Sequence, residues 1–377
     1  MSGKIRNNIL FLSLICCGFH TTAATGNDST DCKRSFFIEP VVRMGKIIPV
    51  HSGLKDLPQL QMYSLEVKIG KQTAGEKDWE YRYRYPRYGV SLRYGHFGEK
   101  MFGDKAVVYG FVNRSFLRYK FLSLHYQLGM GVAYWFRCYD SIQNPENRYL
   151  GSHLNAYIDL ELGVGFRLSP TFDLTLNGAF THSSNGAAIM PNLGINVLSA
   201  HAGLRYHINQ RPQTIYPIDS AKSFSPKNSL HFFVAPAFRQ SKKSPGTTFG
   251  AGTVQLGYMR QFHPKFRFGA GVDFLYSAEL QYHLPPEQHS HWKYCSQAAF
   301  ASFEIVYNRV AAHAALAVYI NKSFDFYEFY YERLGVKVFL GKKYNHFVGF
   351  SVKAHGGIAD YIEWTYGYQF LTWGKKK

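Results

Sequence analysis

Long segments in which apolar and polar residues alternate recur from residue 35 to residue 370, and they constrain the fold most strongly. Glycine, proline, asparagine, aspartate and serine separate these segments. Soluble strands usually have five or six residues, whereas a tilted strand needs about ten to cross a bilayer. The alternation therefore predicts an all-β chain whose strands cross a membrane. Clear cases are residues 61–72, 88–98, 121–136, 157–169, 199–209, 265–277 and 361–370.

Such strands must close into a barrel, because lipid cannot satisfy the open edge of a sheet. Single-chain bacterial barrels have even strand numbers, and we count about sixteen candidate segments. We therefore expect a transmembrane antiparallel β-barrel of the bacterial outer membrane with about 12–16 strands. The connection 210–228 contains three prolines and could divide two units. We interpret it as a long loop within one barrel that spans residues 25–377.

Residues 1–24 have the features of a secretory signal peptide. Lys4 and Arg6 precede the apolar run 9–19, and small residues follow it up to Ala24. The rest of the sequence has no run of 18 apolar residues, so no membrane-spanning helix is expected there.

The cysteines support export without defining a disulfide framework. Cys16 and Cys17 leave open the alternative of a lipoprotein attachment site within the signal peptide. Signal cleavage would leave Cys32, Cys138 and Cys295, an odd number that permits one bridge without showing which pair forms it.

The formal net charge of +18 indicates an anionic partner. For a cytosolic protein this charge would suggest nucleic acid. An exported protein instead meets anionic lipid and lipopolysaccharide, so we expect attraction to a membrane surface and no nucleic-acid partner. The segment 81–94 alternates tyrosine and arginine as a nucleic-acid platform might. We interpret it as a strand near the membrane interface.

The segment 171–196 places polar residues where the alternation requires apolar ones. Its apolar series starts at Phe172 and would continue through His182 and Ser184. In the following segment, Asn196 falls on the apolar series that includes Leu198. Because the apolar series of a membrane barrel faces lipid, we expect all three polar residues on the outer surface. An antiparallel hairpin can bring Asn196 opposite His182.

These three residue types suit nucleophilic catalysis. A serine becomes a good nucleophile when a base within hydrogen-bond reach takes its proton, and His182 lies two residues from Ser184 on the same face. The carbonyl oxygen of Asn196 can fix the imidazole orientation. Donors for a developing oxyanion could come from backbone amides of the turn at Asn185 and Gly186, or from the Asn192 side chain.

The sequence HSSNGAAIMPNLGIN, residues 182–196, resembles the active-site segment of the lipid A 3-O-deacylase (PagL) family. In that family a His-x-Ser-Asn element precedes a Pro-Asn-x-Gly turn. The segment is also similar to the His-x-Ser-Asn-Gly element of outer-membrane phospholipase A. Both families are outer-membrane barrels that cleave acyl esters on the outside of the barrel.

The resemblance implies that His182 is the base and Ser184 the nucleophile, with Asn185 and Asn192 in support. The deacylase triad ends in a glutamate at the position of Asn196, whereas the phospholipase has an asparagine there. The resemblance covers about residues 170–209, so we place the catalytic segment within about 35–209. The strands over about 229–370 are left unexplained by it.

We therefore predict a serine esterase that acts on lipid A or lipopolysaccharide, with outer-membrane phospholipase A as the alternative. A non-catalytic porin or structural barrel is the rival from another class, and a soluble exported β-sandwich is a third option. No metal or other cofactor is expected. The loop 283–295 contains three histidines and Cys295, and we interpret it as a polar loop. The sequence leaves the oligomeric state open.

Strand counting gives one statement about topology. If the mature N-terminus lies in the periplasm, odd-numbered strands run outward. Residues 172–185 form the seventh predicted strand, so Ser184 would lie near the outer leaflet, where lipid A resides.

Overall fold

The computed structural model describes residues 35–48, 61–208, 224–241, 244–322, 324 and 328–374. The predicted signal peptide, Cys32 and most of the connection 210–228 lie outside the described residues. Within them, the first eight strands are β1 (Ser35–Ile47), β2 (Gln61–Gln72), β3 (Arg87–Phe97), β4 (Asp104–Arg118), β5 (Leu122–Trp135), β6 (Leu154–Arg167), β7 (Phe172–Ser184) and β8 (Ile195–His207). The second eight are β9 (Lys227–Ser241), β10 (Ser244–His263), β11 (Phe266–Ser277), β12 (Cys295–Tyr307), β13 (Val310–Asn321), β14 (Tyr330–Leu340), β15 (His346–His355) and β16 (Ile358–Trp373).

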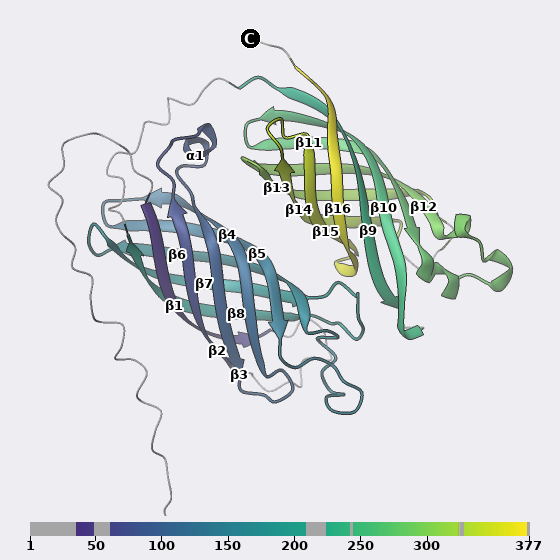
Figure 1. The fold of residues 1–377 in the computed structure, drawn as a ribbon, viewed down its shortest axis with the longest axis horizontal. Coiled ribbons are helices and arrows are strands. Elements are labelled where there is room, and N and C mark those ends of the chain that lie inside the picture. Colours follow the sequence, from purple (N-terminus) through teal and green to yellow (C-terminus); the bar gives the residue numbers. More distant parts are fainter. Residues whose placement is uncertain are drawn as a thin grey trace, which may run out of the picture. The chain divides into compact units, whose positions relative to one another are not determined.

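The strands form two closed antiparallel barrels of eight strands each (Figure 1). The N-terminal barrel closes where β1 pairs with β8, with Val41 opposite Gly203. The C-terminal barrel closes where β9 pairs with β16, with Val234 opposite Tyr366. The predicted all-β antiparallel barrel architecture is confirmed, but the expectation of one barrel is wrong.

The error has a physical reason. Alternation reports which face a side chain takes, but it does not report which strand closes the sheet. Sixteen strands lie within the predicted range, yet β8 returns to β1 before β9 begins. The connection 210–228 therefore separates two barrels along the chain and is not a loop within one.

The predicted strand at 81–94 is wrong in its first half. A short helix, α1 (Asp78–Arg82), precedes the turn that leads to β3. The Glu80 carboxylate accepts hydrogen bonds of 2.9 Å from the backbone amides of Gly75 and Glu76, which links the helix to the segment before it. Arg84 has a left-handed φ of 57°, so extended structure starts only at Arg87. Among the described residues, no helix is long and apolar enough to span a membrane.

Alternation separates the two faces of each strand. In β3, Val90, Leu92 and Tyr94 are exposed on the outer surface, whereas Ser91 and Arg93 are buried inside the barrel. An apolar outer band with a polar interior is typical of a membrane barrel.

Ion pairs fill the interior of both barrels. In the N-terminal barrel, the Arg43 guanidinium lies 3.0 Å from Glu66, 3.2 Å from Asp159 and 2.7 Å from Glu161. Eight strands enclose a space that side chains can fill completely. The N-terminal barrel is therefore a packed polar core.

The C-terminal barrel follows the same design. Its buried Arg333 lies 2.7 Å from Asp273 and 2.6 Å from Glu363. Such interiors do not favour a wide water-filled channel, which larger barrels provide.

Candidate active site

The predicted catalytic residues lie at one end of the N-terminal barrel, where β7 ends and β8 begins. His182 is paired directly with Asn196 across the two strands. His182 and Ser184 are half-buried on the outer surface, whereas Thr181 and Ser183 are buried inside the barrel. The hairpin therefore gathers the polar residues on the outward face, as their positions in the alternation predict.

Asn196 contacts the His182 ring. Its side-chain oxygen Oδ1 lies 2.7 Å from Nδ1 of His182, so a proton on Nδ1 makes a hydrogen bond to Asn196. This bond places a lone pair on Nε2, the nitrogen that can act as a base. Asn196 thereby favours the ring orientation and the tautomer that leave Nε2 able to accept a proton.

Two donors converge on the Ser184 hydroxyl. Nδ2 of Asn192 donates a hydrogen bond of 2.8 Å to Oγ, and the Gly186 backbone amide donates one of 3.1 Å. Asn192 also accepts a bond of 3.3 Å from the Asn185 backbone amide. A side-chain amide and a backbone amide that meet beside a nucleophile are the groups from which oxyanion holes are built.

Asn185 supports the loop. Among the described hydrogen bonds, its side chain makes none to Ser184 Oγ. Its buried side-chain amide donates bonds of 2.9 Å to Ser152 Oγ and to the Ile189 carbonyl. It thus ties the start of the loop 185–194 to the middle of that loop and to the β5–β6 loop, residues 136–153.

The β5–β6 loop is a part of the site that sequence reasoning missed. Its backbone carbonyls at Arg148 and Tyr149 accept hydrogen bonds of 3.2 and 2.9 Å from the amides of Leu193 and Gly194. These bonds join two loops that lie about 45 residues apart in sequence, so no local pattern could reveal them. The turn that contains Asn192 is therefore held in place by the β5–β6 loop, which lies outside the β7–β8 hairpin.

The β5–β6 loop is itself anchored by an aromatic core inside the barrel end. Tyr149 and Leu150 are buried in the same cluster as Phe102 and Trp135. The rings of Phe102 and Tyr149 lie 5.5 Å apart between centroids. The site therefore sits above a packed support, which limits the movement of the donors around Ser184.

Gly194 is required by its surroundings. Its φ is +74°, in the left-handed region that other residues rarely adopt. A Cβ at this position would lie 2.9 Å from Cε1 of His182 and 3.5 Å from Cβ of Ser184. The glycine lets the backbone pass directly against the imidazole and so helps to set its position.

One predicted contact is not made. In the described part of the chain, no hydrogen bond joins the His182 ring to the Ser184 hydroxyl, whose oxygen instead accepts from Asn192 and Gly186. Catalytic hydrogen bonds are often long or absent before substrate binds. The roles of His182, Ser184 and Asn196 stay predictions.

The C-terminal barrel has a different hairpin at the corresponding place in its strand order. Gly356 and Gly357, with φ values of 56° and 79°, join β15 directly to β16. Residues 353–360 contain neither serine nor asparagine. The candidate site therefore belongs to the N-terminal barrel alone.

The histidines of the loop 283–295 do not converge. His283 Nε2 lies 2.9 Å from Glu279, whereas His289 Nε2 lies 3.0 Å from the Leu284 carbonyl. Among the described residues, no group of three His, Cys, Asp or Glu side chains is arranged to hold a metal ion. Cys138 and Cys295 are free thiols.

Comparison with known proteins gives the family. A model described as lipid A 3-O-deacylase (PagL) matches residues 64–205, which contain the whole candidate site. A model described as acyloxyacyl hydrolase, C-terminal domain, matches residues 228–373. No curated protein matches the chain.

Solved structures with similar chains are outer-membrane proteins. The outer-membrane enzyme PagL is 17% identical with a TM-score of 0.33, covering 44% of this chain and 97% of its own. Neisserial surface protein A is 13% identical with a TM-score of 0.32, covering 46% of this chain and 98% of its own. The two matched models, one on each barrel, identify a PagL-like chain that is an ester hydrolase of the bacterial outer membrane.

Proposed function

We propose that this chain removes a fatty-acyl chain from lipid A or lipopolysaccharide through a Ser-His-Asn site on the outer surface of its N-terminal barrel. The convergence of Asn192 and Gly186 on Ser184, beside a histidine already oriented by Asn196, is the observation that supports the proposal most directly.

Ser184 is the nucleophile in this mechanism. Its hydroxyl turns from the Asn192 amide toward His182, and its proton passes to Nε2 as Oγ bonds to the ester carbonyl carbon. The imidazolium then returns that proton to the sugar oxygen as the ester bond breaks. Water attacks the acyl-serine in the same way and releases the fatty acid. Asn196 holds the ring throughout, without the added charge stabilisation that a carboxylate would give.

Asn192 and the Gly186 amide stabilise the intermediate. When Oγ becomes part of the ester adduct, the negative oxygen develops beside it, within reach of the two donors that Oγ leaves free. Donors fixed before the reaction stabilise the transition state most, since they need no reorganisation. The hydrogen bonds from Asn185 to Ser152 and Ile189 keep this loop in place.

The outer surface below the site suits a lipid. A shallow hollow lies on the same face as His182, and a Cβ on Gly178 would meet no atom within 4 Å. Small residues at this point leave room for an acyl chain. The exposed Lys46, which also lines the hollow, can pair with a phosphate of the lipid. Residues that line the hollow are Met44, Gly45, Lys46, Gln61, Met62, Tyr63, Gly178, Leu198, Ser199 and Ala200.

The decisive experiment compares the lipids of cells that produce the wild type, Ser184→Ala or Ser183→Ala. Ser183 is the matched control, because it is the neighbouring serine but faces into the barrel. Mass spectrometry of lipid A is expected to show loss of one acyl chain with the wild type and Ser183→Ala but not with Ser184→Ala. Deacylation by Ser184→Ala would reject the proposed nucleophile.

Phospholipase A activity is the second candidate, because Asn196 stands where the deacylase family has a glutamate. The same extracts distinguish it. Lysophospholipid that accumulates with the wild type, while lipid A keeps its mass, would assign the site to phospholipids. A non-catalytic barrel would leave both lipid classes unchanged.

A further inference from the structure

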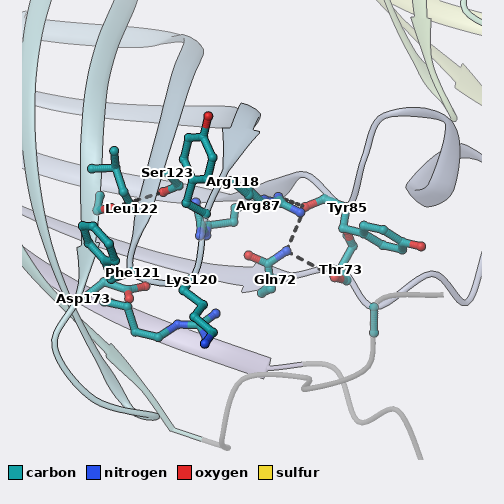
Figure 2. A pocket seen from close by; sticks show the side chains of 14 residues that line it. Gln72, Thr73, Tyr85, Arg87, Arg118, Lys120, Phe121, Leu122, Ser123 and Asp173 are labelled. Carbon is teal, nitrogen blue, oxygen red and sulfur yellow. Dashed lines mark hydrogen bonds between the residues drawn. The ribbon is translucent and has the colours of Figure 1, made fainter. Parts of the chain in front are cut away.

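A separate cavity of about 220 Å³ opens at the other end of the N-terminal barrel. Asp173 lines it, whereas Ser184 lies eleven residues later on the same strand, about 36 Å away at the usual rise per residue. Figure 2 shows Arg87, Arg118 and Lys120 around this cavity together with Asp173. The proposed esterase mechanism uses none of these side chains.

Positive charge exceeds negative charge in the lining. Four cationic side chains, Arg87, Arg118, Lys120 and Arg167, share the cavity with a single carboxylate, that of Asp173. That carboxylate already lies 3.0 Å from Nε2 of His207, outside the lining. The cavity therefore has an unbalanced positive potential, which low-dielectric walls concentrate.

Deeper in the same barrel, two buried cations are neutralised by carboxylates. Lys68 lies 2.8 Å from Glu161, and Arg205 lies 2.8 Å from Glu39. In the cavity, by contrast, Arg118, Lys120 and Arg167 form no ion pair with any carboxylate in the part of the chain that the structure describes. The described residues therefore supply no carboxylate partner to these three groups.

The cavity wall is held by polar contacts. Nη2 of Arg118 donates a hydrogen bond of 3.0 Å to the Tyr85 carbonyl, and Nε2 of Gln72 donates one of 2.8 Å to the same oxygen. Arg87 is buried, with Nη1 3.3 Å from Asn113. The guanidinium of Arg118, fixed in this way, loses little side-chain entropy when a ligand binds.

The mouth of the cavity has the character of a membrane interface. Lys120 and Arg167 are exposed, and Tyr119 and Phe121, on either side of Lys120, expose their rings. Aromatic residues beside basic ones are typical of the headgroup level of a bilayer. A ligand that enters here comes from the headgroup layer or from the adjacent water.

From this charge, volume and position we infer that the cavity binds the phosphate group of an anionic ligand, contributed either by a phospholipid headgroup or by a small soluble phosphate. Arginine matches phosphate oxygens with two parallel N–H donors, and lysine adds a point charge. The site is distinct from the ester-cleaving one, so the inference stands apart from the proposed function.

The test uses the full chain in non-ionic detergent and measures binding, not hydrolysis. The probes are a dialkyl-ether phosphatidylglycerol, which has no ester to cleave, the matching ether glycerol without phosphate, and inorganic phosphate. Native mass spectrometry reports the lipids, and calorimetry reports the phosphate. The variant Lys120→Gln/Arg167→Gln removes two exposed charges from the mouth. The control Lys100→Gln/Arg137→Gln removes two exposed charges at the opposite end.

We expect the mouth variant to bind at least tenfold more weakly than the wild type and the control variant to bind like the wild type. Binding of the ether phosphatidylglycerol alone would identify a lipid headgroup as the source, and binding of inorganic phosphate would identify a soluble one. Either result supports the inference. It is overturned if neither probe binds, if the phosphate-free glycerol binds equally well, or if the control variant loses as much affinity as the mouth variant.

Discussion

The side-chain amide of Asn192 donates a hydrogen bond of 2.8 Å to the hydroxyl oxygen of Ser184. This contact joins the end of β7 to the turn before β8, and it is the shorter of the two hydrogen bonds that the proposed nucleophile accepts.

Asn192→Asp is expected to lower kcat by about 10²- to 10³-fold, because it removes an oxyanion donor and adds a negative charge beside the developing one. The aspartate keeps an oxygen for the Asn185 amide, so the loop should persist. Steady-state kinetics on purified lipid A, with circular dichroism as a folding check, measure this. A variant with wild-type kcat would mean that the donor acts elsewhere.

Replacing the partner of His182 should affect catalysis in a graded way. Asn196→Ala removes the acceptor of the 2.7 Å bond to Nδ1 and is expected to lower kcat by about 10- to 100-fold. Asn196→Asp restores an acceptor and supplies the missing charge, so it should be at least as active as the wild type. Full activity in the alanine variant would show that the ring is oriented by something else.

Gly194→Ala tests how closely the backbone supports the imidazole. The added Cβ would approach Cε1 of His182 to 2.9 Å at a strained φ, and the displaced ring should lower kcat by about 10- to 100-fold. Gly98→Ala is the control, since a Cβ there meets nothing within 4 Å. Equal activities for the two variants would contradict a positioning role for Gly194.

The barrel interior should be sensitive to loss of a single cation. Arg43→Leu leaves Glu66, Asp159 and Glu161 without their shared partner, and a broken buried pair costs about 3–5 kcal/mol. Urea unfolding in detergent should show this loss, whereas Arg137→Leu on the surface should change the free energy of unfolding by less than about 0.5 kcal/mol. Identical midpoints would argue that Arg43 is not needed to balance the interior.

The sequence predicted strands and faces well because both follow from local periodicity. The expected segment 61–72 coincides with β2, and 172–184 is the seventh strand, as counted. The outward positions of His182 and Ser184 follow from the same period of two. Nothing in that period indicates that β8 returns to β1, since closure depends on pairing between residues 150–170 positions apart.

Local sequence patterns also gave no sign of the β5–β6 loop contacts that support the site. Ser152 and Tyr149 matter because the β5–β6 loop folds onto the turn after β7, and a polar loop without periodicity gives no signal of that contact. The helix α1 was missed because its Tyr81 and Arg82 continue the composition of the strand that follows. Tertiary packing decided both cases.

Because β1 pairs with β8 and β9 pairs with β16, each of the two sheets is closed by its own strands. Each half of the chain thus completes its own sheet without a strand from the other half.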